Sequence, residues 1–141
     1  MNTLIFCTSI LNNNTIFTYA EWWKYYRAKF PDATFLLVND GKVEQHVFDE
    51  LQKLTKYEFN KSNLIEFDDK LGRNDHYHWG WWRSFRTALL YGRDNFDKIL
   101  HIECDAIVLS NRLFNFLSNE NTGWRCLFSE SYGFSESAIQ I

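Results

Sequence analysis

The stretch from residue 18 to residue 41, "TYAEWWKYYRAKFPDATFLLVNDG", places a helix pattern directly before a strand pattern. In its first half, apolar side chains recur every three or four residues, which predicts a helix with one buried face. Thr18 and Glu21 have the T-x-x-E spacing of a capping box, and Pro31 is expected to end the helix. Residues 34–38, "TFLLV", then predict a buried strand that ends at an "NDG" turn.

The same alternation of strand and helix patterns continues along the chain. Strands are predicted at 3–10, 34–38, 64–67, 98–109 and 125–128, and helices at 18–30, 42–54 and 80–92. This order predicts one α/β domain over residues 1–141, with a doubly wound, mostly parallel, Rossmann-like sheet and right-handed crossovers. Residues 136–141, "ESAIQI", are typical of a helix that has just begun, so we expect the fold to be incomplete at its C-terminus.

Composition narrows the classes of partner and the location. The 141 residues carry a net charge of −3 with no basic stripe, which argues against a nucleic-acid polymer but leaves open a single nucleotide held by a metal ion. The three cysteines, Cys7, Cys104 and Cys126, lack C-x-x-C spacing, so we expect free thiols in a reducing compartment. The N-terminal residues have no signal-peptide pattern and no membrane-span pattern, and we therefore expect a cytoplasmic protein.

The expected fold also indicates where a ligand binds. In open parallel sheets, ligands lie beyond the carboxyl ends of the strands. Here those ends fall at 8–14, at 39–41, from residue 68 onward and at 103–105, and three of these four places carry acids. Acids from separate strands are therefore expected to meet at one edge of the sheet.

Two of these acids, Glu103 and Asp105, lie inside the apolar stretch "KILHIECDAIVLS" at 98–110. Alternation along a strand puts both on one face and turns Cys104 toward the core. Two carboxylates on one face repel each other unless a cation or a proton lies between them, and Mg²⁺ and Mn²⁺ prefer such oxygen ligands. The alternative is structural: one acid caps the next helix and the other pairs with Arg112 or with an arginine of a helix.

Residues 97–117, "DKILHIECDAIVLSNRLFNFL", resemble the D-x-D region of nucleotide-sugar glycosyltransferases with the GT-A fold. The preceding "WWRSFRTALLYGRDNFDKIL" resembles the family's helix before that strand. The N-terminal "IFCTSI" and "YYRAKFPDATFLLVNDG" are similar to its first nucleotide-binding β-α-β unit. The likeness covers most of residues 3–117, with Glu103 standing where the family has its first aspartate.

The resemblance implies a metal-dependent enzyme of the hexosyltransferase type, with Mn²⁺ or Mg²⁺ as cofactor and a UDP- or GDP-sugar as donor. Its acceptor is an unknown glycan or another hydroxyl compound. By matching position, Asp105 is expected to bind the metal, and Glu103 to contact the ribose or, through water, the metal. Thr8 is expected to touch the nucleotide, and Asp40 to hold its base or ribose, although "NDG" is equally a plain turn.

Four further residues are candidates for the chemistry of glycosyl transfer. Arg83 and Arg86 lie three apart on the predicted third helix and face either a diphosphate or, as the plainer interpretation, solvent. An inverting enzyme also needs a general base for the acceptor hydroxyl, and Glu130 and Glu136 are the candidates for it. We expect the acceptor-binding part to be either missing from this chain or supplied by a partner.

The segment "NDHYHWGWW", residues 74–82, offers a competing interpretation. His76 and His78, with Asp75 and the upstream Asp68 and Asp69, have the residue types of a metallohydrolase, but no third histidine has ligand spacing. We expect instead a mobile loop over a cleft.

The tryptophans of that segment, Trp79, Trp81 and Trp82, are expected either to stack on a sugar or, for two of them, to lie in the core. No G-x-G-x-x-G, Walker or G-x-S-x-G motif is present. Two functional alternatives to the transferase remain: a catalytically silent interaction domain, and a sugar-phosphate nucleotidyltransferase.

Overall fold

The computed structural model describes residues 2–74, 77–119, 123–129 and 133–141. Its strands are β1 (Thr3–Ser9), β2 (Thr34–Asn39), β3 (Leu64–Glu66), β4 (Lys98–Ile102), β5 (Cys126–Ser129) and β6 (Phe134–Gln140). Its helices are α1 (Ile16–Lys29), α2 (Gln45–Leu54), the 3-10 turn η1 (Lys61–Asn63), α3 (Trp79–Asn95) and α4 (Asn111–Asn119). Within the described residues the strands form one sheet, in the order β3-β2-β1-β4-β6-β5.

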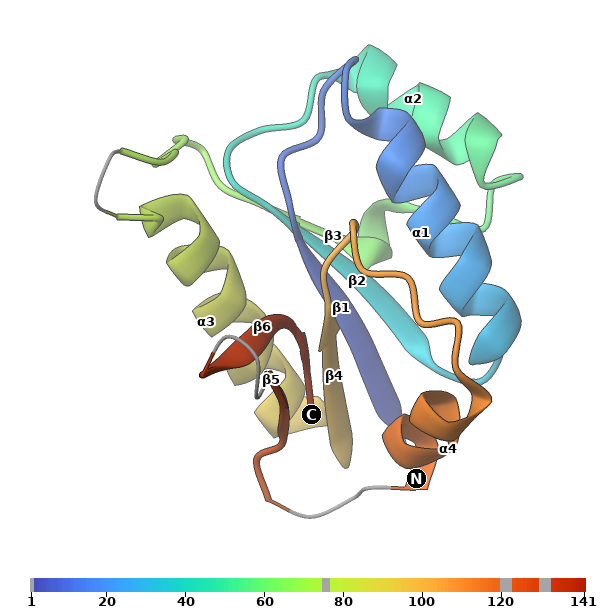
Figure 1. Ribbon diagram of the computed structural model, residues 1–141. Coiled ribbons are helices and arrows are strands. Elements are labelled where there is room, and N and C mark those ends of the chain that lie inside the picture. The colour runs from blue at the N-terminus through green and yellow to red at the C-terminus, as the bar shows by residue number, and fades with distance from the viewer. Residues whose placement is uncertain (1, 75–76, 120–122, 130–132) are drawn as a thin grey trace.

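The first four strands are parallel, and helices cover both faces of the sheet (Figure 1). On β1, Ile5 and Cys7 point into a core shared with α1, α2 and α4, whereas Leu4 and Phe6 point toward α3. A strand buried on both faces needs a nearly continuous apolar run, which "TLIFCTS" supplies. The α/β class and the doubly wound arrangement predicted from the sequence are therefore confirmed.

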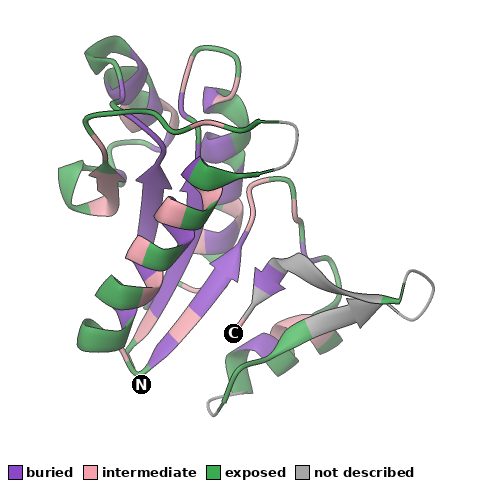
Figure 2. Cartoon of the chain, turned by 90° about the vertical axis from the view of Figure 1, so that its left-hand side faces the viewer, coloured by how far each residue is buried: buried purple, intermediate pink, exposed green. Residues whose placement is uncertain are grey.

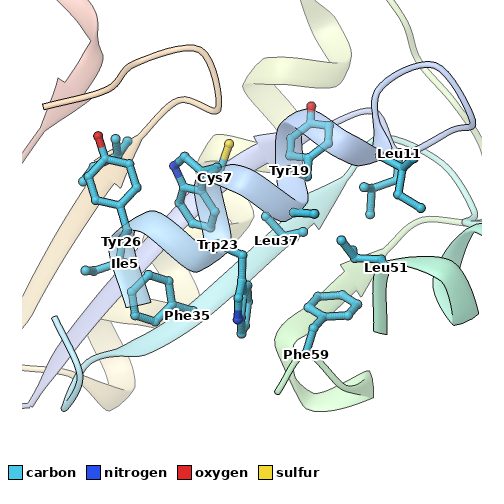
Figure 3. Close-up of a cluster of buried hydrophobic side chains, with 14 of the residues drawn as sticks. Ile5, Cys7, Leu11, Tyr19, Trp23, Tyr26, Phe35, Leu37, Leu51 and Phe59 are labelled. Carbon is cyan, nitrogen blue, oxygen red and sulfur yellow. The ribbon is translucent and has the colours of Figure 1, made fainter. Parts of the chain in front are cut away.

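The larger core lies between α1, α2 and the sheet, and it is rich in aromatic rings (Figure 3). Trp23 of α1 meets Phe35 of β2 and Phe59 with ring centroids 5.4 and 5.3 Å apart. Tyr26 of the same helix donates a hydrogen bond from its hydroxyl to the carbonyl of Ala106, at 2.6 Å. The core helix α1 therefore also holds the segment that follows β4.

The bounds of most elements differ from those predicted by one to several residues, and α1, α3 and β4 show it most clearly. Helix α1 begins at Ile16, two residues before Thr18, and its N-cap residue is Thr15 without a side-chain capping bond. The T-x-x-E capping box is therefore wrong. Helix α3 extends past its predicted range at both ends, and β4 ends at Ile102, where the chain turns and the N–H of Ala106 bonds to the carbonyl of Glu103.

The C-terminal segment also differs, because "ESAIQI" is part of strand β6 and not the start of a helix. Strand β6 runs antiparallel to β4, where Ile139 lies opposite Ile102, and β5 pairs with it in turn. So short a segment carries too little periodicity to separate strand from helix, and its pairing with β4 is a tertiary contact. Among the described helices, none is long and apolar enough to cross a membrane.

The burial pattern follows this architecture. The central strands are buried along most of their length, while the outer side of α3 is exposed (Figure 2). The chain leaves β1 toward β2 on one side, and β4 lies on the other side of β1. The carboxyl ends of β1 and β4 therefore form the topological switch point, the usual place for a ligand in such sheets.

Candidate functional site

A cavity of about 430 Å³ lies at the carboxyl ends of β1 and β4. We call it the site cavity. Its lining comes from the ends of β1, β2 and β4, from the loop before α3 and from the first turns of α1 and α3: Thr8, Ser9, Ile10, Tyr19, Asp40, Gly72, Arg73, His78, Gly80, Trp81, Ser84, Glu103 and Asp105. Four residues predicted from separate places in the sequence, namely Thr8, Asp40, Glu103 and Asp105, thus line one cavity.

Glu103 is the most enclosed acid near the end of β4, with 18% of its side chain exposed. The hydroxyl of Thr8 donates to its two carboxylate oxygens at 3.0 and 3.1 Å, and the indole N–H of Trp81 donates to Oε1. The Nε2 atom of His101 lies 3.0 Å from the same Oε1. A histidine and two donors, not an arginine, therefore compensate the buried charge.

Burial raises the pKa of Glu103, but contact with His101 and the bonds from Trp81 and Thr8 outweigh it, so the pKa falls below its ordinary value. Glu103 is therefore a charged carboxylate at neutral pH. The Nε2 atom of His101 lies within ion-pair distance of Glu103. Neither ring nitrogen of His101, however, makes a hydrogen bond to a described residue.

Asp105 has the opposite environment. It is exposed, it belongs to the turn after β4, and it lines the site cavity. The structure gives Asp105 no hydrogen bond or ion pair with any described residue. The intervening Cys104 packs against the core on the α1 side. The two acids therefore differ in kind: Glu103 is anchored within the protein, and Asp105 presents a free carboxylate to the cavity.

Asp40 is nearly fully buried and holds the loop before α3. Its carboxylate accepts hydrogen bonds from the backbone N–H groups of Leu71 at 3.1 Å and Gly72 at 2.7 Å, and from Arg83 at 2.6 Å. Burial raises the pKa of Asp40, but the three donors together lower it by more than burial raises it. The pKa of Asp40 therefore lies below its ordinary value. A Cβ atom at Gly80 would lie 2.1 Å from Asp40 Oδ2, so α3 approaches the carboxylate through a glycine.

Arg83 is committed to this same network. Its guanidinium bonds to Asp40 and also to Asp69 at 2.7 Å, and it lies over the ring of Phe67 at 4.0 Å. Arg86 is exposed on α3 and is not among the described residues that line the site cavity. Contact of either arginine with a diphosphate stays a prediction, as does contact of Asp40 with a nucleotide.

Only the last part of the segment 74–82 is helical, because α3 begins at Trp79, and a mobile loop stays a prediction for the residues before it. Trp79, Trp81 and Trp82 belong to the first turn of α3. Trp81 stacks on Phe85 and lines the site cavity, whereas Trp79 and Trp82 are exposed.

The histidine metal site has little support in the described part of the chain. Asp75 and His76 lie outside the described residues. His78 is the one histidine in the described lining of the site cavity. Asp68 pairs with Lys42, and Asp69 with Arg83. No three metal-ligating side chains gather anywhere in the described ranges.

The two candidates for a general base fall in the C-terminal segment. Glu130 lies outside the described residues. Glu136 belongs to β6, and its side chain also lies outside the described part. The catalytic role of both stays a prediction.

Several residues in or beside the site, among them Ser9, Arg73, Tyr19 and His101, were missed as functional candidates. His101 precedes Glu103 by two positions, and strand alternation alone places both on one face. Tyr19 lies in the helical apolar pattern of residues 18–30, yet its hydroxyl accepts a bond from the N–H of Ile10 at 3.0 Å and the residue lines the site cavity. Burial raises the pKa of Tyr19 well above its usual value, so its hydroxyl stays protonated.

Comparisons of the chain with models of protein families, with characterised proteins and with solved structures found no match. The function must therefore be argued from the site cavity itself. Its described lining includes three carboxylates, of which Asp40 and Glu103 bond within the protein and Asp105 does not, together with hydroxyl groups and the indole of Trp81, and it lies at the switch point of a parallel sheet.

Proposed function

We propose that this chain is a glycosyltransferase domain that binds a nucleotide-sugar, UDP- or GDP-linked, together with Mn²⁺ or Mg²⁺. The observation that carries the proposal is the free carboxylate of Asp105 beside the anchored Glu103, at the switch point where parallel sheets bind nucleotides. The resemblance of residues 97–117 to a D-x-D region supports the same assignment.

The donor set fits a hard divalent cation. Mg²⁺ and Mn²⁺ at nucleotide sites are commonly held by one or two carboxylates, with substrate phosphates and waters completing the shell. Asp105 would supply the carboxylate, and Glu103, already bonded on both oxygens, would fix the turn that presents it. When bound, the ion would act as a Lewis acid that stabilises the leaving diphosphate.

The cavity walls suggest how the rest of the donor is held. Ser9 and Tyr19 line the cavity beside Thr8, and the aromatic side chain of Trp81 lines it as well. Arg73 lines the same cavity from the loop before α3, where its positive charge would favour a diphosphate. The acceptor is a glycan or another hydroxyl compound, and the free thiols of Cys7, Cys104 and Cys126 support a cytoplasmic location.

Calorimetry with UDP and GDP tests this proposal. We expect binding in the presence of Mn²⁺ and its loss on addition of EDTA. Asp105→Ala is expected to weaken metal-dependent binding by about tenfold or more, equivalent to roughly 1.4 kcal/mol. Asp32→Ala is the matched control, because Asp32 is also exposed but precedes β2, at the opposite edge of the sheet. Binding that is unchanged by EDTA or by Asp105→Ala would refute the proposal.

A catalytically silent interaction domain is the second candidate. It is favoured by the engagement of Asp40 and Glu103, both of which bond to the protein and not toward the cavity. Such a domain would bind neither UDP nor GDP with Mn²⁺, and its stability would not respond to the nucleotide. A thermal shift assay with each nucleotide and Mn²⁺ therefore separates the two candidates.

A further inference from the structure

A second cavity, of about 390 Å³, lies on the α3 face of the sheet, between β4 and α3. We call it the aromatic cavity. Its position is distinct from the carboxyl edge of the sheet that holds Asp105. The residues that give it its character are Phe6, Phe85, Leu89, Phe96, His101 and Trp124.

The floor of the aromatic cavity consists of three rings that pack against one another, although Arg93, Asp97 and Lys98 also line the cavity. Phe6 of β1 and His101 of β4 are buried and stacked, with ring centroids 4.7 Å apart. Phe85 of α3 meets His101 edge to face, at 5.0 Å. These three rings belong to the central sheet and its covering helix, so the floor is formed before any ligand arrives.

Trp124 forms the outer wall, and 55% of it is exposed to solvent. Its ring lies 6.2 Å from that of Phe85, with the planes at 68°. Because about half of Trp124 is exposed beside this cavity, a second aromatic ring stacked against it would bury apolar surface that is now in contact with water. Arg93, which also lines the cavity, pairs with Asp94, so its charge is already partly compensated.

We infer that the aromatic cavity is a binding site for a small planar aromatic molecule. Its volume is in the range of small-molecule sites, and its walls present ring faces and edges at angles that favour an aromatic guest over an aliphatic one. The inference stands independently of nucleotide-sugar transfer, because the described linings of the two cavities have no residue in common.

The aromatic cavity shares a wall with the site cavity, which provides a readout. Phe85 lines the former and stacks on Trp81 of the latter, with centroids 4.8 Å apart and planes at 10°. Trp81 in turn donates to Glu103. A guest against Phe85 is therefore expected to shift the indole N–H resonance of Trp81 although it does not touch that group.

Indole is the probe for the test, followed by ¹⁵N–¹H spectra of the whole chain. We expect saturable shifts at Gly123, at Trp124 and at the indole N–H of Trp81, with cyclohexanol binding at least fivefold more weakly. Trp124→Ala is expected to weaken indole binding by about three- to tenfold, the loss of one aromatic contact. Leu89→Trp, which fills the cavity, is expected to abolish it.

Trp79→Ala is the matched control, because Trp79 is 53% exposed and is not among the described residues that line the aromatic cavity. It should leave indole affinity unchanged within twofold. Three results would overturn the inference: no saturable binding, equal losses in Trp124→Ala and Trp79→Ala, or equal affinity for cyclohexanol. If the wild-type chain self-associates but binds no indole, and Leu89→Trp abolishes the self-association, the cavity is instead a contact between copies of the chain.

Discussion

The indole N–H of Trp81 donates a hydrogen bond to the carboxylate of Glu103, and this bond ties the first turn of α3 to the turn after β4. Thr8 donates to the same carboxylate from β1, and His101 approaches it from β4. Elements that are distant in the sequence thus meet on one charged group. Because an enclosed carboxylate is costly to leave unpaired, these partners hold the wall of the site cavity together whether or not a ligand is present.

Trp81→Phe tests the value of that bond. The substitution keeps a ring against Phe85 and removes the N–H donor, so we expect the free energy of unfolding to fall by about 1–3 kcal/mol. Urea unfolding at pH 7, followed by circular dichroism, measures it. Trp82→Phe is the control, because the neighbouring Trp82 is 58% exposed and should change stability by less than about 0.5 kcal/mol. Equal losses would mean that ring size, and not the hydrogen bond, is what matters.

Acid should remove the contribution of Glu103. Its folded-state pKa lies below the ordinary value of 4.5, because His101, Trp81 and Thr8 together outweigh the effect of burial. A carboxyl with a lowered pKa stabilises the fold above its unfolded pKa and loses that contribution as the pH falls through the folded value. The stability difference between the wild type and Glu103→Gln should therefore shrink below about pH 4.5. Urea titrations from pH 7 to pH 3 would refute this if the difference grew on acidification.

The order of strands and helices could be predicted because each early strand is a local apolar run bounded by turn residues. The positions of Thr8, Asp40, Glu103 and Asp105 followed from that order alone, since parallel strands end at one edge. Strand β6 could not be predicted, because seven residues carry little periodicity and its pairing partner, β4, lies far back in the sequence.

The partners of the polar side chains were the other part that sequence reasoning could not supply. Arg83 lies 43 residues from Asp40 and 14 from Asp69, and no local pattern indicates that it turns inward to bind both. The division of the acid pair into an anchored Glu103 and a free Asp105 likewise depends on Trp81, which was expected to stack on a sugar or lie in the core, and on His101, for which no role was predicted. Strand alternation could have paired His101 with Glu103, but a histidine within an apolar run is usually structural.

Gly80→Ala should destabilise the protein although alanine favours a helix. In an open helix this change gains up to about 1 kcal/mol, but here the new Cβ would lie 2.1 Å from Asp40 Oδ2. We therefore expect a net loss of about 1–3 kcal/mol in the free energy of unfolding, as for an overpacked core. Thermal unfolding gives the sign directly. In an Asp40→Ala background the same substitution should cost less, and an undiminished cost there would place the clash elsewhere.

Thr15→Ala and Thr18→Ala form a pair that separates the real start of α1 from the predicted one. The hydroxyl of Thr15 donates to the carbonyl of Ile10 at 2.6 Å and accepts from the N–H of Asn12 at 3.1 Å, so it fixes the loop between β1 and α1. We expect its removal to cost about 1 kcal/mol of unfolding free energy, the usual value of such a bond. Thr18 is exposed within the helix, and its substitution should change stability by less than about 0.5 kcal/mol. Urea denaturation of both variants decides the matter, since a loss in Thr18→Ala as large as that in Thr15→Ala would mean that the T-x-x-E box forms in solution.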